Sequence, residues 1–315
     1  MNQMTDETSK YTKIVGLPAK VAARFRLLAW LVFLTQVLIV ATGGAVRLTG
    51  SGLGCSTWPK CTPESFVHNP EMGIHSYIEF GNRLLFFLLE IVAILAVIVI
   101  WRYRKKRKNL FVLVVIAALS VFIQAIIGGI TVLSGLNPYV VGLHYVASAL
   151  LVMLSALLVL RTYRGPAVWQ PQFSISMRQW VGITAFAGIA VILLGILTTG
   201  SGPHAGDGGA ARNELDTQTL VHLHALASYL TLFGTLMVNV LARVNKAFHV
   251  IRWSNATLLV MLLQIVVGVW QTRNALPPLL VGIHMVLATM LASGIFLIVI
   301  ESYTRVLGKS ELKRQ

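Results

Sequence analysis

Runs of about 20 apolar residues recur along the chain, separated by short polar segments. A helix of that length crosses the hydrocarbon core of a bilayer and satisfies its own backbone hydrogen bonds there. The pattern therefore predicts an all-α membrane protein with eight transmembrane helices. The expected spans are residues 27–46, 77–101, 110–133, 140–160, 180–199, 220–241, 254–272 and 279–303.

The second half of the chain repeats the first. His144 follows Gln124 by 20 residues, and the same arrangement recurs 140 residues later with Gln264 and His284. A Thr-Gly-Ser-Gly motif also follows both the first and the fifth span. The repeat predicts two pseudo-symmetric four-helix bundles related by an axis along the membrane normal. The division expected from it is an N-terminal tail (1–24), an N-terminal half (25–164), a linker (165–178), a C-terminal half (179–303) and a C-terminal tail (304–315).

The distribution of basic residues predicts how the chain is oriented in the membrane. The chain is 56% hydrophobic and 12% charged, yet carries a net charge of +15. With eight spans both termini lie on one side, and the basic residues gather in the tails and the loops of that side. This positive-inside pattern predicts cytoplasmic termini in a cell membrane and contact with anionic lipid, with no nucleic-acid partner. The basic residues outside that pattern are Arg47, Lys60, Arg83, Arg212 and Arg273.

The sequence has two cysteines, Cys55 and Cys61, and both fall in the first outer loop. The outer side of a cell membrane is oxidising, which favours a disulfide over the alternative of two free thiols.

Histidines within the apolar runs are candidates for chemistry, because ionisable groups in a membrane are costly. His144, His224 and His284 all lie near the outer ends of their helices. Two imidazoles on neighbouring helices suit axial ligation of a haem iron, and His224 and His284 form such a pair. The alternative for any single histidine is a hydrogen bond to a neighbouring helix. His222 lies about 200° round the helix from His224 and is expected to point elsewhere.

The N-terminal half differs in its second ligand position. Asn82 stands where a histidine would complete a pair with His144, so we expect this half to hold a haem by one axial bond or differently. Glu79, one turn earlier, suits proton transfer or stabilisation of developing positive charge, but an ion pair with Arg83 is an equal alternative. Arg47 and Arg83 suit the binding of haem propionates, the alternative being extension to the membrane interface.

Several short motifs, taken together, resemble a known family. They are the run GGAVRLTGSGLGC from Gly43 to Cys55, the Trp58-Pro59 pair, Cys61, the run from Glu79 to Arg83, and the histidines His144, His224 and His284. Their order over residues 25–303 resembles haem A synthases. The sequence IEFGNR that ends at Arg83, with a cysteine-free second outer loop, is similar to the actinobacterial branch of that family.

The resemblance implies an eight-helix enzyme that oxidises the C8 methyl of haem O to the formyl group of haem A, for cytochrome oxidase assembly. It implies haem b in the C-terminal half on His224 and His284, and the substrate haem in the N-terminal half near His144 and Glu79. It also implies a Cys55–Cys61 disulfide over that site. Asn82 departs from the histidine of many members, and His75 is one conceivable replacement.

The implied partners are haem O, haem O synthase, oxidase assembly factors and membrane lipid, while the electron acceptor is unspecified. The alternative function is a mono-haem or di-haem b cytochrome that transfers electrons between quinol and a partner. A non-catalytic transporter or assembly factor is a further alternative, because repeated halves around a cavity also suit transport.

Overall fold

The computed structural model describes residues 16–69 and 73–307. Within them lie eight helices, each long and apolar enough to cross a membrane, which confirms the predicted all-α membrane class. Two three-residue strands, β1 and β2, were not predicted. The elements are α2 (Ala19–Leu48), α3 (Ile74–Trp101), α4 (Lys108–Leu133), α5 (Pro138–Tyr163), β1 (Ala167–Trp169), α6 (Ile175–Ser201), α7 (Thr217–Val244), α8 (Phe248–Arg273), α9 (Pro278–Tyr303) and β2 (Thr304–Val306).

Helix boundaries differ from the expected spans because the helices continue past the hydrocarbon. Helix α2 begins at Ala19, inside the expected tail of residues 1–24, because Ala22 and Phe25 are buried against neighbouring helices. Helix α6 begins inside the expected linker, where the Ser174 side chain accepts a hydrogen bond from the backbone N–H of Met177 and caps the helix. Residues 1–15 and 308–315 of the two expected tails lie outside the described residues.

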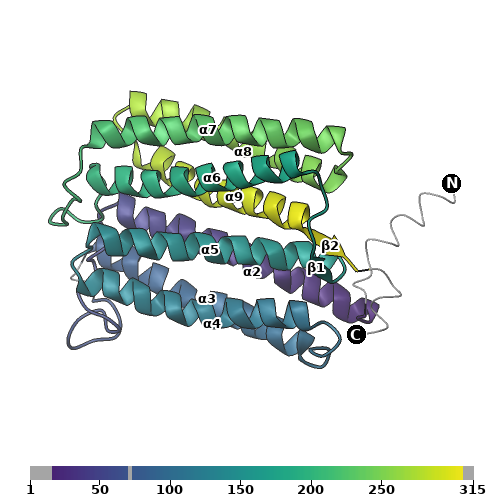
Figure 1. The fold of residues 1–315 in the computed structure, drawn as a ribbon. Coiled ribbons are helices and arrows are strands. Elements are labelled where there is room, and N and C mark those ends of the chain that lie inside the picture. The colour runs from purple at the N-terminus through teal and green to yellow at the C-terminus, as the bar shows by residue number, and fades with distance from the viewer. Residues whose placement is uncertain (1–15, 70–72, 308–315) are drawn as a thin grey trace, which may run out of the picture.

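The helices form two four-helix groups, as Figure 1 shows. Helices α2 to α5 pack in a ring, each against the next and α5 against α2, and helices α6 to α9 repeat this arrangement. The two groups meet mainly where α9 packs on α2 and α5. This matches the two halves expected from the repeat.

Small residues and one polar contact join the halves. A Cβ atom built on Gly142 would lie 2.7 Å from Ile196 of the other half, so close approach at this position requires glycine. The Tyr145 hydroxyl donates a hydrogen bond of 2.7 Å to the backbone carbonyl of Met285. Tyr145 and Met285 are equivalent positions in the repeat, so this contact crosses the pseudo-symmetry axis.

At the end of the molecule where α2 begins and α9 ends, the linker and the segment after α9 are tied together. Strand β1 pairs antiparallel with β2, with Ala167 opposite Val306. The Arg164 guanidinium binds both carboxylate oxygens of Glu301 at 2.9 Å. The end of the first half is thereby held to the end of the second.

The apolar cores lie at this same end of both bundles. The core of the N-terminal half includes Phe25, Ile100 and Leu158, and that of the C-terminal half includes Met177 and Ile298. The opposite ends, which we call the outer ends, are hollow by contrast, and the candidate site lies there.

Candidate functional site

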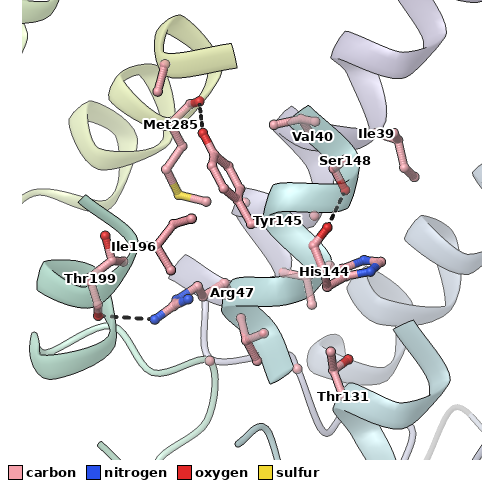
Figure 2. Close-up of a pocket in the computed structure, with 18 of the residues that line it drawn as sticks. Ile39, Val40, Arg47, Thr131, His144, Tyr145, Ser148, Ile196, Thr199 and Met285 are labelled. Atoms are coloured by element: carbon pink, nitrogen blue, oxygen red, sulfur yellow. Dashed lines mark hydrogen bonds between the residues drawn. The ribbon is translucent and has the colours of Figure 1, made fainter. Parts of the chain in front are cut away.

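One cavity of about 1220 Å³ occupies the outer part of the protein and is lined by residues of all eight helices. Its volume exceeds the range of about 300–1,000 Å³ that is usual for a site holding one small ligand. His144, His224 and His284 all line it, so the cavity joins the candidate positions of both halves. Figure 2 shows its central region, where His144 and Tyr145 lie on α5 and Met285 on α9.

In the C-terminal half two imidazoles face each other across the cavity. The ring centres of His224 and His284 are 6.3 Å apart, with the ring planes inclined by 66°. Two metal–nitrogen bonds of about 2 Å, together with the distance from each ring centre to its coordinating nitrogen, add up to about this separation. The predicted pair therefore fits one shared haem iron.

The second nitrogen of one ring supports this arrangement, while Nδ1 of His284 is buried with no hydrogen-bond partner among the described residues. Nδ1 of His224 hydrogen-bonds the Val191 carbonyl at 3.0 Å, which leaves Nε2 for a ligand and fixes the orientation of the ring. Glycines of the preceding helices leave room for both rings, because a Cβ built on Gly195 or Gly268 would lie within 3.2 Å of the imidazole. His222 is exposed and is not among the lining residues, as expected.

In the N-terminal half, His144 occupies the position that corresponds to His284. Its backbone carbonyl accepts a hydrogen bond from Ser148, whose hydroxyl in turn accepts one from the Gln124 side chain at 2.8 Å. Among the described residues, Nδ1 of His144 is buried with no hydrogen-bond partner. Asn82 lines the same cavity from α3.

The first outer loop closes the outer end of the cavity. Cys55 and Cys61 form a disulfide, which confirms that prediction. Trp58 of the loop lines the cavity and packs so tightly on α4 that a Cβ atom at Gly129 would collide with the indole ring. We call residues 53–62, the disulfide-linked part of this loop, the lid.

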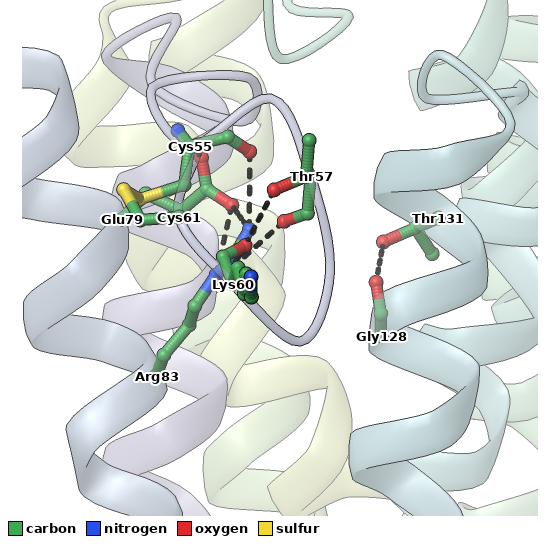
Figure 3. Close-up of polar contacts among 8 residues, drawn as sticks. All are labelled: Cys55, Thr57, Lys60, Cys61, Glu79, Arg83, Gly128 and Thr131. Carbon is green, nitrogen blue, oxygen red and sulfur yellow. Dashed lines mark hydrogen bonds and ion pairs between the residues drawn. A yellow bond between two sulfur atoms is a disulfide. The ribbon is translucent and has the colours of Figure 1, made fainter. Parts of the chain in front are cut away.

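Glu79 and Arg83 hold the lid in place, as Figure 3 shows. Glu79 accepts a hydrogen bond of 2.7 Å from the Cys55 backbone N–H, and its other carboxylate oxygen pairs with Arg83 at 2.5 Å. Arg83 also donates to the backbone carbonyls of Cys55, Thr57 and Lys60 at 3.0–3.1 Å. The ion pair that was the alternative for Glu79 is therefore present, although Glu79 also lines the cavity.

Arg47 joins α2 to the second half of the chain. Its Nε donates to the His204 carbonyl in the loop after α6 at 2.8 Å, and Nη2 donates to the Thr199 carbonyl of α6 at 3.1 Å. Arg47 lines the cavity, and within the described residues no acceptor is bonded to Nη1.

His75 lies away from the candidate haem positions. It is exposed, its Nδ1 hydrogen-bonds Ser51 at 2.8 Å, and it lines a separate, smaller surface cavity. Gln36, Tyr145 and Met285 are among the residues of the large cavity that sequence reasoning did not single out for the site. Gln36 could have been found from the sequence, because a polar residue inside an apolar run is a candidate for function, and its side chain is indeed buried.

Comparison with known proteins supports the resemblance. A protein named "Heme A synthase" from Listeria welshimeri is 34% identical over 116 residues, which is 36% of this chain and 38% of that protein. Another "Heme A synthase", from Bacillus cereus strain AH187, is 33% identical over 124 residues, 38% of this chain and 39% of the relative. The matched part thus spans less than two-fifths of the length of these relatives.

The family model described as COX15-CtaA, cytochrome oxidase assembly protein, matches a much longer part of the chain, residues 26–296. That range contains all eight helices in whole or in large part, and every residue of the candidate site. The chain therefore belongs to the COX15-CtaA family of cytochrome oxidase assembly proteins.

Proposed function

We propose that the protein is a haem A synthase, which oxidises the C8 methyl of haem O to the formyl group of haem A for cytochrome oxidase assembly. The observation that carries this proposal is the cavity, in which one half presents a facing imidazole pair and the other a single imidazole. The family match and the names of the relatives agree with it.

In the C-terminal half, His224 and His284 would hold haem b through their ring nitrogens. When bound there, the haem supplies one-electron redox chemistry. The Val191 carbonyl orients His224, and Gln264 donates to the His284 backbone carbonyl at 3.2 Å. The first contact fixes the orientation of the His224 ring, and the second holds the backbone of α9 at His284.

In the N-terminal half, His144 would bind the iron of the substrate haem. Nη1 of Arg47 offers a donor for a propionate at the outer mouth of the cavity. Arg83 gives its donors to Glu79 and the lid, so we assign it to positioning the lid over the substrate. Glu79 is the carboxylate that lines this half, where it stabilises charge or accepts protons during oxidation.

The prenyl tail of haem O would reach the lipid between α3 and α4. Leu84 and Phe87 of α3 and Phe122 and Ile126 of α4 line the cavity, and each is between 48% and 60% exposed. Exposed apolar side chains on two neighbouring helices suit a lateral opening for a lipid-soluble substrate.

The basic tails and loops support a multi-pass plasma-membrane protein with both termini in the cytoplasm. In that orientation the lid and its disulfide face the oxidising side. Haem O synthase is the enzyme that would supply the substrate, and oxidase assembly factors would receive the product.

The test is co-expression with haem O synthase, followed by extraction of the bound pigments and identification by mass. We expect haem O, haem A and haem b in the extract, with haem A absent from a His144→Ala control. Haem b alone would favour the alternative of an electron-transfer cytochrome, and a colourless protein would favour transport or assembly.

A further inference from the structure

Four positions in the cavity share one local arrangement, in which a side chain lies beside a glycine of the preceding helix. Three of these side chains are histidines and the fourth is Asn82. A Cβ built on the glycine would lie 3.0 Å from the side chain for Gly195 and His224, 3.2 Å for Gly268 and His284, 3.4 Å for Gly128 and His144, and 4.0 Å for Gly43 and Asn82. Asn82 thus occupies the place in the N-terminal half that His224 holds in the C-terminal half.

The Asn82 side chain differs chemically from the three histidines. A carboxamide is a poor ligand for haem iron but can both donate and accept a hydrogen bond. The Oδ1 atom of Asn82 is buried and has no hydrogen-bond partner in the part of the chain that the structure describes. A buried polar atom of this kind calls for a partner that the described residues do not provide.

Neighbouring groups do not replace the missing imidazole. His144, His224 and His284 are the imidazoles among the described lining residues. His75 is bonded to Ser51 outside this cavity, and the carboxylate of Glu79 is occupied by Arg83 and the Cys55 N–H. Asn82 therefore stands on α3 at the position of a ligand, and none of the lining imidazoles of the described residues comes from α3.

We propose that Asn82 leaves one face of the substrate haem without a protein ligand, and that its carboxamide hydrogen-bonds a small molecule bound on that face. This inference rests on the proposed function, because it takes the haem of the N-terminal half to be bound through His144. In the C-terminal half, His224 and His284 close both faces. The N-terminal haem alone then admits an external ligand.

A reciprocal exchange of the two side chains tests the open face. The full-length protein in detergent is reduced and titrated with carbon monoxide, and the haem content of each variant is measured by pigment extraction. Wild-type protein should bind carbon monoxide at one of its two haems. Asn82→His should abolish that binding and convert the N-terminal haem to the low-spin form, while His224→Asn should add a second carbon monoxide site.

The hydrogen bond is tested with Asn82→Leu, which keeps the branched shape of the side chain and removes both polar atoms. Carbon monoxide only accepts hydrogen bonds, so it reports donation from Nδ2 of Asn82, which bonds to none of the described residues. It should still bind to Asn82→Leu, and it should dissociate about 2- to 10-fold faster, the range expected for loss of one neutral hydrogen bond. The C–O stretching band should shift as well. Equal dissociation rates and an unshifted band in wild type and Asn82→Leu would overturn this part of the inference.

The remaining outcomes separate this inference from the proposed function. Undiminished carbon monoxide binding in Asn82→His would overturn the inference, as would no binding to wild-type protein that holds two haems per chain. If Asn82→His does not retain its N-terminal haem, His224→Asn still decides, because failure to gain a site there refutes the reasoning. Wild-type protein with a single haem, held by His224 and His284, would refute the proposed function instead.

Discussion

Replacing Glu79 by Gln should loosen the lid. The carboxylate accepts from the Cys55 N–H through one oxygen and from Arg83 through the other. A glutamine has a single acceptor oxygen, so its NH₂ group must face one of these donors and leave it unpaired. Both side chains of the ion pair are largely buried, with 19% of Arg83 and 6% of Glu79 exposed, so solvent weakens the interaction only modestly.

The size of the effect follows from these contacts. Losing a charged hydrogen bond and leaving a buried donor unpaired destabilises by about 2–4 kcal/mol. Since about 1.4 kcal/mol corresponds to a tenfold change, the closed lid should open roughly 30- to 700-fold more often.

Hydrogen exchange followed by mass spectrometry measures this opening directly. Protection of the amides of the lid, and of Cys55 above all, should fall by that factor in Glu79→Gln. Glu90→Gln is a matched control, because Glu90 is a buried glutamate of the same helix with no contact to the lid. If haem A formation were lost while protection of the lid stayed at the wild-type level, Glu79 would act in the chemistry alone and our reasoning about the lid would be refuted.

Three further expectations follow from other parts of the structure. His284→Ala should remove the low-spin haem b absorption while His222→Ala, on the exposed face of α7, should leave it intact; equal spectra would exclude the ligand pair. Tyr145→Phe should lower the free energy of unfolding by about 0.5–1.5 kcal/mol, measured by denaturant titration in detergent, because one hydrogen bond between the halves is lost. Hydrogen bonds from the Thr219 side chain and backbone N–H lower the pKa of the Asp216 carboxyl. The cap that Asp216 forms on α7 should therefore be complete above the ordinary pKa of aspartate and be lost as the pH falls through the lowered value. Constant hydrogen exchange of the Thr219 amide through that range would contradict this expectation.

Much of the fold could be predicted because a bilayer imposes a simple rule on the sequence. Apolar runs must form helices there, and each polar residue inside a run stands out. For that reason the eight spans, the repeat and the pair His224 and His284 were all recognisable before the structure. The two-half packing follows from the repeat, since equivalent helices bury equivalent faces.

The contacts of the lid could not be predicted in the same way. Arg83 binds backbone carbonyls of Cys55, Thr57 and Lys60, and any residue type can supply a carbonyl, so the sequence carries no mark of these bonds. Strands β1 and β2 are three residues long and lie about 135 residues apart in the chain, and their pairing depends on where α5 and α9 end. Helix ends depend on capping and packing beyond the membrane, which explains the early start of α2.

The apolar cores at the end where α2 begins and α9 ends form the floor of the cavity. The cavity is lined from the outer ends of the helices inward as far as Gln36 on α2 and Leu291 on α9, and packed side chains follow in both bundles. The lid covers the other end, so in this conformation a molecule in the cavity leaves past the lid or sideways into lipid. The packed cores separate it from the end where α2 begins and α9 ends.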